Sequence, residues 1–138
     1  MVDDIVLAKA ESIERCLRRV REEFGADGAG LEADYTRQDA LILNLLRACE
    51  TSIDLAMHRV RTRELGVPES SRDAFQRLVD AGNLPTELAA SMMRMVGFRN
   101  IATHNYRELD VTIVRRIVND QLSDFQRFAD LMVQCQDR

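Results

Sequence analysis

The sequence of 138 residues has almost no lysine: Lys9 is the single lysine among 19 basic residues, and the other 18 are arginine. Catalysis through a lysine Schiff base or a P-loop lysine is therefore nearly excluded, because Lys9 lies in no glycine-rich loop. Tryptophan is absent, and there are only 2 prolines and 6 glycines in a chain that is 46% hydrophobic. This composition argues against a disordered or fibrous protein and favours a globular one.

Cysteine is scarce as well, and Cys16, Cys49 and Cys135 are odd in number and far apart. No CxxC pair is present, so the sequence encodes neither a zinc cage nor a thioredoxin-like motif. Each cysteine falls on an apolar helical stripe, and we expect buried, reduced thiols. A reducing compartment is the expected location.

Long apolar runs are also missing. No basic region leads into an apolar stretch at the N-terminus, so no signal peptide is predicted. The longest runs, residues 40–43 and 95–98, are far too short to span a bilayer. We therefore expect a cytoplasmic protein without membrane contact, and a single domain over residues 1–138.

Apolar residues recur at steps of three and four in five segments, which is the spacing that lines one face of a helix. No segment alternates as a β-strand would. The predicted helices span residues 6–24, 35–65, 71–81, 85–104 and 111–135. We therefore predict an all-α fold, an antiparallel bundle of four main helices plus one short helix.

Residues at the ends of these segments support the predicted boundaries. Gly25 suits the position after a helix, and Ser70 with Asp73 resembles a capping box. Pro85 suits a first helical turn, where a missing N–H costs nothing, and Asp110 is a good N-cap for the last helix.

The fourth predicted helix ends in a dense group of polar side chains, of which Arg99 and His104 are candidate functional residues. In a continuous helix, five residues correspond to about 140° of rotation and about 7.5 Å of rise, so the two side chains would not share a face. Either the helix distorts near His104, or a second subunit completes the site. The end of a helix favours a protonated imidazole, and an arginine near such a histidine suits phosphate chemistry.

This pair permits cleavage of RNA without a metal ion. RNA carries its own nucleophile, the 2′-hydroxyl, so an enzyme needs only to move protons and to stabilise charge on phosphorus. His104 could act as the general acid or base, and Arg99 could hold the phosphoryl oxygens. The spacing alone is also compatible with a purely structural role, with Arg99 in a surface ion pair and His104 capping the helix.

The run FRNIATHNY at residues 98–106 resembles the R-x4-H-x-Y signature of HepT-like toxins, the DUF86 branch of the HEPN superfamily of helical ribonucleases. The resemblance extends over roughly residues 36–132. Further segments that are similar to this family are residues 53–56, 66–68, 71–75 with Leu78, and 95–98.

The resemblance implies that Arg99 and His104 are the catalytic pair of a metal-independent endoribonuclease acting on tRNA or mRNA, and that Asn100 helps to order the site. It implies a homodimer in which two motifs face each other across one cleft. Tyr106 would be the side chain to which a minimal nucleotidyltransferase (MNT) antitoxin transfers AMP, placing negative charge beside the RNA groove. The alternative is a non-catalytic HEPN-like module that binds nucleotide or regulates a nucleotidyltransferase.

The second predicted helix carries a polar stripe that is expected to face solvent: Asn44, Arg47, Thr51, Asp54, His58 and Arg61. Asp54 could support the site by pairing with Arg99, or it could be a solvated surface carboxylate. Asp54 and His58 have a spacing that could bind a metal, but no third ligand is evident. We therefore predict no metal site and no cofactor, and we interpret His58 as a surface residue.

The formal net charge of −4 argues against a protein that coats nucleic acid nonspecifically. Residues 94–116 nevertheless hold five arginines against two acidic residues, a local charge of +3. The arginines of this predicted basic patch are Arg94, Arg99, Arg107, Arg115 and Arg116. If two chains juxtapose their patches, the cleft between them would suit RNA phosphates.

Overall fold

The computed structural model describes residues 3–135, and these residues form only helices and connections. The α-helices are α1 (Asp4–Phe24), α2 (Tyr35–Thr62), α3 (Ser71–Asp80), α4 (Thr86–His104), α5 (Val111–Asp120) and α6 (Leu122–Cys135). Two single-turn 3-10 helices, η1 (Leu31–Ala33) and η2 (Tyr106–Glu108), lie in the connections before α2 and α5. The predicted all-α class is confirmed.

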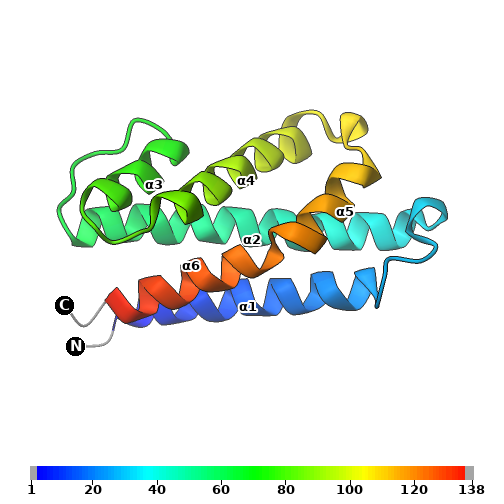
Figure 1. Cartoon of the computed structure of the whole chain (residues 1–138), viewed down its shortest axis with the longest axis horizontal. Helices are drawn as coiled ribbons and strands as arrows, with labels where there is room; N and C mark the ends of the chain where they lie inside the picture. The colour runs from blue at the N-terminus through cyan, green and yellow to red at the C-terminus, as the bar shows by residue number, and fades with distance from the viewer. Residues whose placement is uncertain (1–2, 136–138) are drawn as a thin grey trace.

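The helices form an antiparallel bundle that is built on the long α2 (Figure 1). Figure 1 shows α1 and α2 running in opposite directions, with α4 and the α5–α6 pair lying across them. The short α3 packs at the end where α2 finishes and α4 begins. The end of α4, followed by η2, lies at the opposite end of the bundle from the start of α1.

The predicted apolar stripe of α1 becomes part of the core. Its buried residues are Val6, Ile13, Cys16, Leu17, Val20 and Phe24. The carboxylate of Asp3 caps this helix by accepting hydrogen bonds from the N–H groups of Ile5 (3.0 Å) and Val6 (3.3 Å). Gly25 ends it with φ +75°, a left-handed value that glycine adopts without a Cβ clash.

The polar stripe of α2 is only partly solvated, because α1 runs alongside it. Asn44 is 9% exposed, and its side-chain amide donates to the Ala40 carbonyl at 2.9 Å. His58 is 5% exposed, with Nε2 at 2.7 Å from Oδ2 of Asp3. The interpretation of His58 as a surface residue is therefore wrong, since this imidazole joins the C-terminal half of α2 to the cap of α1.

The predicted last helix is divided into α5 and α6 at Gln121. Its buried residues are Val114 and Ile117 in α5, then Leu122 and Phe125 in α6. The step of five from Ile117 to Leu122 would place these side chains about 140° apart in a continuous helix. The interruption lets both face the core, so the prediction of one continuous helix over residues 111–135 is wrong.

Cys16 and Cys49 are buried and free, as predicted, and burial raises the pKa of both thiols. The side chain of Cys135 lies outside the described residues. Over residues 3–135, no helix combines the length and the apolar character that are needed to cross a membrane.

Candidate active site at the end of α4

The motif predicted from the sequence lies at the C-terminal end of α4 and in η2. The helix continues without interruption through Arg99 to His104, and the Asn105 N–H closes its last turn by donating to the Ile101 carbonyl at 2.8 Å. His104 is exposed, as is Asn100. The helix therefore ends at His104 rather than distorting before it, so Arg99 and His104 point in different directions.

Arg99 is turned toward α2 and α3 and is held by contacts with both. Its Nη1 lies 3.6 Å from Oε2 of Glu50 in α2, and its Nη2 donates to Oγ of Ser71 in α3 at 3.2 Å. The side chain of Arg99 is 23% exposed. Its Nε is buried, and no acceptor among residues 3–135 reaches that atom. The guanidinium group is thus fixed in direction, with part of its hydrogen-bonding capacity unused.

Asp54 does not hold Arg99. Its Oδ2 lies 3.9 Å from Nζ of Lys9 in α1, and its side chain is 62% exposed. The predicted Asp54–Arg99 pair is therefore incorrect, because the position of Asp54 one turn beyond Glu50 brings it to α1 instead of α4. Glu50, the carboxylate that faces Arg99, was not part of the predicted polar stripe, and nothing in the sequence indicated Ser71 as a partner of Arg99.

Tyr106 reaches α2 at a second point. Its hydroxyl donates a hydrogen bond to Oδ1 of Asp39, near the start of α2. Partial burial, together with this bond and the negative charge of Asp39, raises the pKa of Tyr106 to about 12. The hydroxyl is thus protonated and oriented by Asp39, on a side chain that is still 44% exposed.

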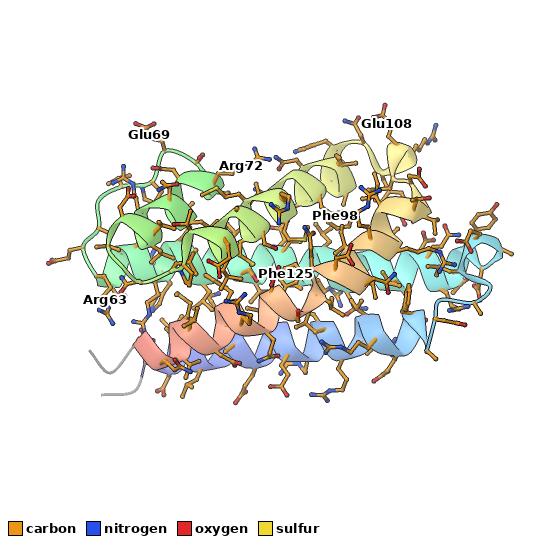
Figure 2. The ribbon with its side chains drawn as sticks, viewed as in Figure 1. Arg63, Glu69, Arg72, Phe98, Glu108 and Phe125 are labelled. Atoms are coloured by element: carbon orange, nitrogen blue, oxygen red, sulfur yellow. The ribbon has the colours of Figure 1, made fainter. Side chains whose placement is uncertain are left out.

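Figure 2 shows that residues around the motif face either the core or the solvent. Phe98, immediately before Arg99, lies on the inner side of α4 and is buried, whereas Glu108 of η2 projects outward. Apolar contacts of Phe98 and Ala102 with the core therefore set the rotation of α4 about its axis. That rotation places His104 at the surface and Arg99 against α2.

Fewer arginines of the predicted basic patch are available to a ligand than the sequence suggested. Arg115 binds both carboxylate oxygens of Glu32 and donates to the Gly28 carbonyl at 2.7 Å, which fastens α5 to the loop after α1. Its inclusion in an RNA-facing patch is therefore incorrect, since its donors are used within the fold. The arginines of the patch that are exposed and lack an ion pair within residues 3–135 are Arg94, Arg107 and Arg116.

The described residues contain no group of three or more histidine, cysteine, aspartate or glutamate side chains arranged to hold a metal ion. The two nitrogens of His58 face Asp3 and Nη2 of Arg61, which is 3.2 Å from Nδ1. The Asp54 and His58 side chains are thus engaged with different partners.

Comparison with known proteins gives a consistent result. A family profile described as "Ribonuclease HepT-like" matches residues 13–132. The mRNA nuclease HepT of Shewanella oneidensis is 42% identical over 131 residues, which cover 95% of this chain and 98% of that protein. A solved structure of a tri-AMPylated Shewanella oneidensis HEPN toxin in complex with an MNT antitoxin matches with a TM-score of 0.90, 42% identity and coverage of 95% of this chain and 98% of that one. A toxin–antitoxin structure with AMP-PNP matches equally well, with a TM-score of 0.90, 42% identity and coverage of 94% and 98%.

An all-α bundle whose fourth helix ends in an Arg-x4-His-x-Tyr motif defines a helical protein of the HEPN class. Within that class, the chain belongs to the HepT-like ribonuclease family.

Proposed function

We propose that this protein is the toxin of a toxin–antitoxin pair and that it cleaves RNA without a metal ion. The observation that carries the proposal is the fixed Arg99 guanidinium and the exposed His104 imidazole at one helix end. The relationship to the mRNA nuclease HepT supports RNA as the substrate.

In the proposed reaction, the 2′-oxygen of a nucleotide attacks the adjacent phosphorus and the bond to the 5′-oxygen breaks. His104 acts either as the base that accepts the proton of the 2′-hydroxyl or as the acid that donates a proton to the leaving 5′-oxygen. Arg99 stabilises the charge that grows on the phosphoryl oxygens. The products are a 2′,3′-cyclic phosphate and a 5′-hydroxyl end. A 2′-deoxy nucleotide at the cleaved position should abolish cleavage.

The active unit in this proposal is a homodimer. The structure supports a second copy because α4 continues as a regular helix to His104, leaving the two side chains on different faces. The same region exposes large apolar residues on α4 and η2, namely Ile101 and Tyr106. Sedimentation at micromolar concentration should show a dimer, and a monomer would remove the shared site.

Neutralisation is proposed to occur by transfer of AMP to Tyr106 by an MNT antitoxin. The phenol oxygen bonds to the α-phosphorus of ATP, the bond to pyrophosphate breaks, and the phenol proton is released. The product carries a negative phosphodiester beside the motif, which repels RNA phosphates. Tyr106→Phe should remove the adduct in a mass spectrum and leave the toxin resistant to ATP-dependent neutralisation.

Growth of cells that express the chain without a partner tests the proposal as a whole. Wild-type protein should stop growth, whereas Arg99→Ala and His104→Ala should not. The alternative, a nucleotide-binding or regulatory module, predicts that all three proteins are equally harmless and that purified protein binds RNA without cutting it.

A further inference from the structure

The exposed stripe of α2 is shared between two neighbouring helices. On one side, Asp39 and Glu50 contact Tyr106 and Arg99, which follow or belong to α4. On the other side, Asp54 contacts Lys9 of α1. Glu50 and Asp54 are four residues apart and therefore lie on the same surface of α2. The motif and the seam between α1 and α2 thus border one surface of that helix.

A groove lies in this seam, with a cavity volume of about 510 Å³. Three arginines line it, Arg15 and Arg19 from α1 and Arg47 from α2. Ser12, Cys16 and Leu43 also line it. Cys16 is nearly buried and Leu43 is 45% exposed, so the groove has an apolar part beneath a cationic rim.

The arginines at the rim are not equivalent. Arg19 is paired within α1, with Glu22 and with Glu23 at 2.8 Å. Arg15 and Arg47 are exposed, and neither forms an ion pair within residues 3–135. Both lie close enough to Cys16 to oppose the rise in its pKa that burial causes. Two guanidinium groups without ion pairs thus line one groove from two helices, and an anion in the groove could accept hydrogen bonds from both.

We propose that this groove binds a phosphodiester segment of the RNA strand next to the nucleotide that is cleaved. The inference rests on the proposed ribonuclease function and adds a binding surface to it. Arg47 precedes Glu50 by three residues, about 4.5 Å along α2, and Glu50 contacts Arg99. A strand lying across α2 would therefore contact Arg99 and the groove in succession.

The chemistry of the groove suits a single strand. Proteins bind single-stranded nucleic acid through cationic grooves that follow the backbone, and arginine forks match phosphate oxygens. The nearby carboxylates of α2 do not cancel this charge, because Glu50 and Asp54 are matched by Arg99 and Lys9. Arg15 and Arg47 supply the net positive charge of the groove.

The test uses a fluorescent single-stranded RNA and full-length protein carrying His104→Ala, so that binding is measured without cleavage. Arg15→Ala with Arg47→Ala should weaken binding by about tenfold. The plot of log affinity against log salt should become shallower by about 1.4, which is about 0.7 for each lost phosphate contact. The matched control is Arg18→Ala with Arg21→Ala, which removes two exposed arginines of α1 outside the groove and should change neither value. In the active protein, the groove variant should raise KM and leave kcat unchanged.

Equal affinity of the groove variant and the control would overturn the inference while leaving ribonuclease function intact. Loss of antitoxin binding with unchanged RNA affinity would also overturn it, by assigning the groove to an acidic protein partner. Failure of the parent protein to bind any RNA would overturn the inference together with the proposed function. Thermal unfolding of each variant checks that the bundle is intact.

Discussion

Single carboxylates of α2 determine how the two key side chains of the motif are presented. Asp39 accepts a hydrogen bond from the hydroxyl of Tyr106, and Glu50 faces the guanidinium group of Arg99. The resemblance to HepT-like toxins located Arg99, His104 and Tyr106, because these residues are close in sequence. It could not locate their partners, which are far away along the chain and meet the motif only after folding.

The first prediction at this scale concerns the ionisation of Tyr106. Asp39→Asn should lower the pKa of Tyr106 from about 12 toward its ordinary value of 10, because the phenolate would no longer face a negative carboxylate. Part of the shift should remain, since burial also contributes to it. Absorbance titration in a Tyr35→Phe background isolates this phenol, as Tyr35 and Tyr106 are the 2 tyrosines of the chain. An unchanged titration curve would show that Asp39 does not contact Tyr106.

The second prediction distinguishes Glu50 from Asp54. Glu50→Gln should lower kcat for RNA cleavage roughly 10- to 100-fold, because a catalytic group that is displaced even slightly loses much of its effect. Asp54→Asn should leave kcat near that of the wild type, since this carboxylate meets Lys9. Initial rates at saturating RNA provide the measurement. The reverse order of the two variants would restore the pairing that spacing along α2 suggested.

At the scale of elements, the apolar stripes predicted where helices form, and caps such as Asp3 and Gly25 fix where α1 begins and ends. The division at Gln121 was not predicted. The step of five residues from Ile117 to Leu122 conflicts with the helical period only if both of these side chains are buried. Burial of Ile117 and Leu122 depends on the packing of α5 and α6 against different neighbours. The same limitation concealed His58, whose burial depends on where the start of α1 lies.

The contact between Asp3 and His58 predicts how the stability of α1 depends on pH. The hydrogen bond from His58 lowers the pKa of Asp3 below its ordinary value of 3.8. The ionised carboxylate therefore stabilises the fold above that value, and this stabilisation is lost as the pH falls through the lowered pKa.

Asp3→Ala should remove both the helix cap, which typically contributes about 1 kcal/mol, and the contact with His58. Asp3→Asn keeps a capping side chain, so it should be less destabilising than Asp3→Ala. Chemical denaturation at pH 7 and at pH 3 measures both effects. A gap between wild type and Asp3→Asn that is as large at pH 3 as at pH 7 would exclude a contribution from the charge of Asp3.

At the scale of the whole molecule, the proposed shared site takes Arg99 and His104 from different copies of the chain. A mixture of Arg99→Ala and His104→Ala subunits tests this requirement. If each site takes one residue from each copy, every mixed dimer contains one intact site, and the mixture should regain about a quarter of wild-type activity for random pairing in a twofold dimer. If each site lies within one chain, the mixture should stay inactive.

Cleavage of labelled RNA by the purified protein in the presence of EDTA is the decisive measurement for metal-free catalysis by Arg99 and His104. Wild-type protein should cut the RNA as fast with EDTA as without it and leave 2′,3′-cyclic phosphate ends. Arg99→Ala and His104→Ala should lose the activity while keeping the fold. Cleavage that EDTA abolishes, or that survives both substitutions, would rule out metal-free catalysis by this pair.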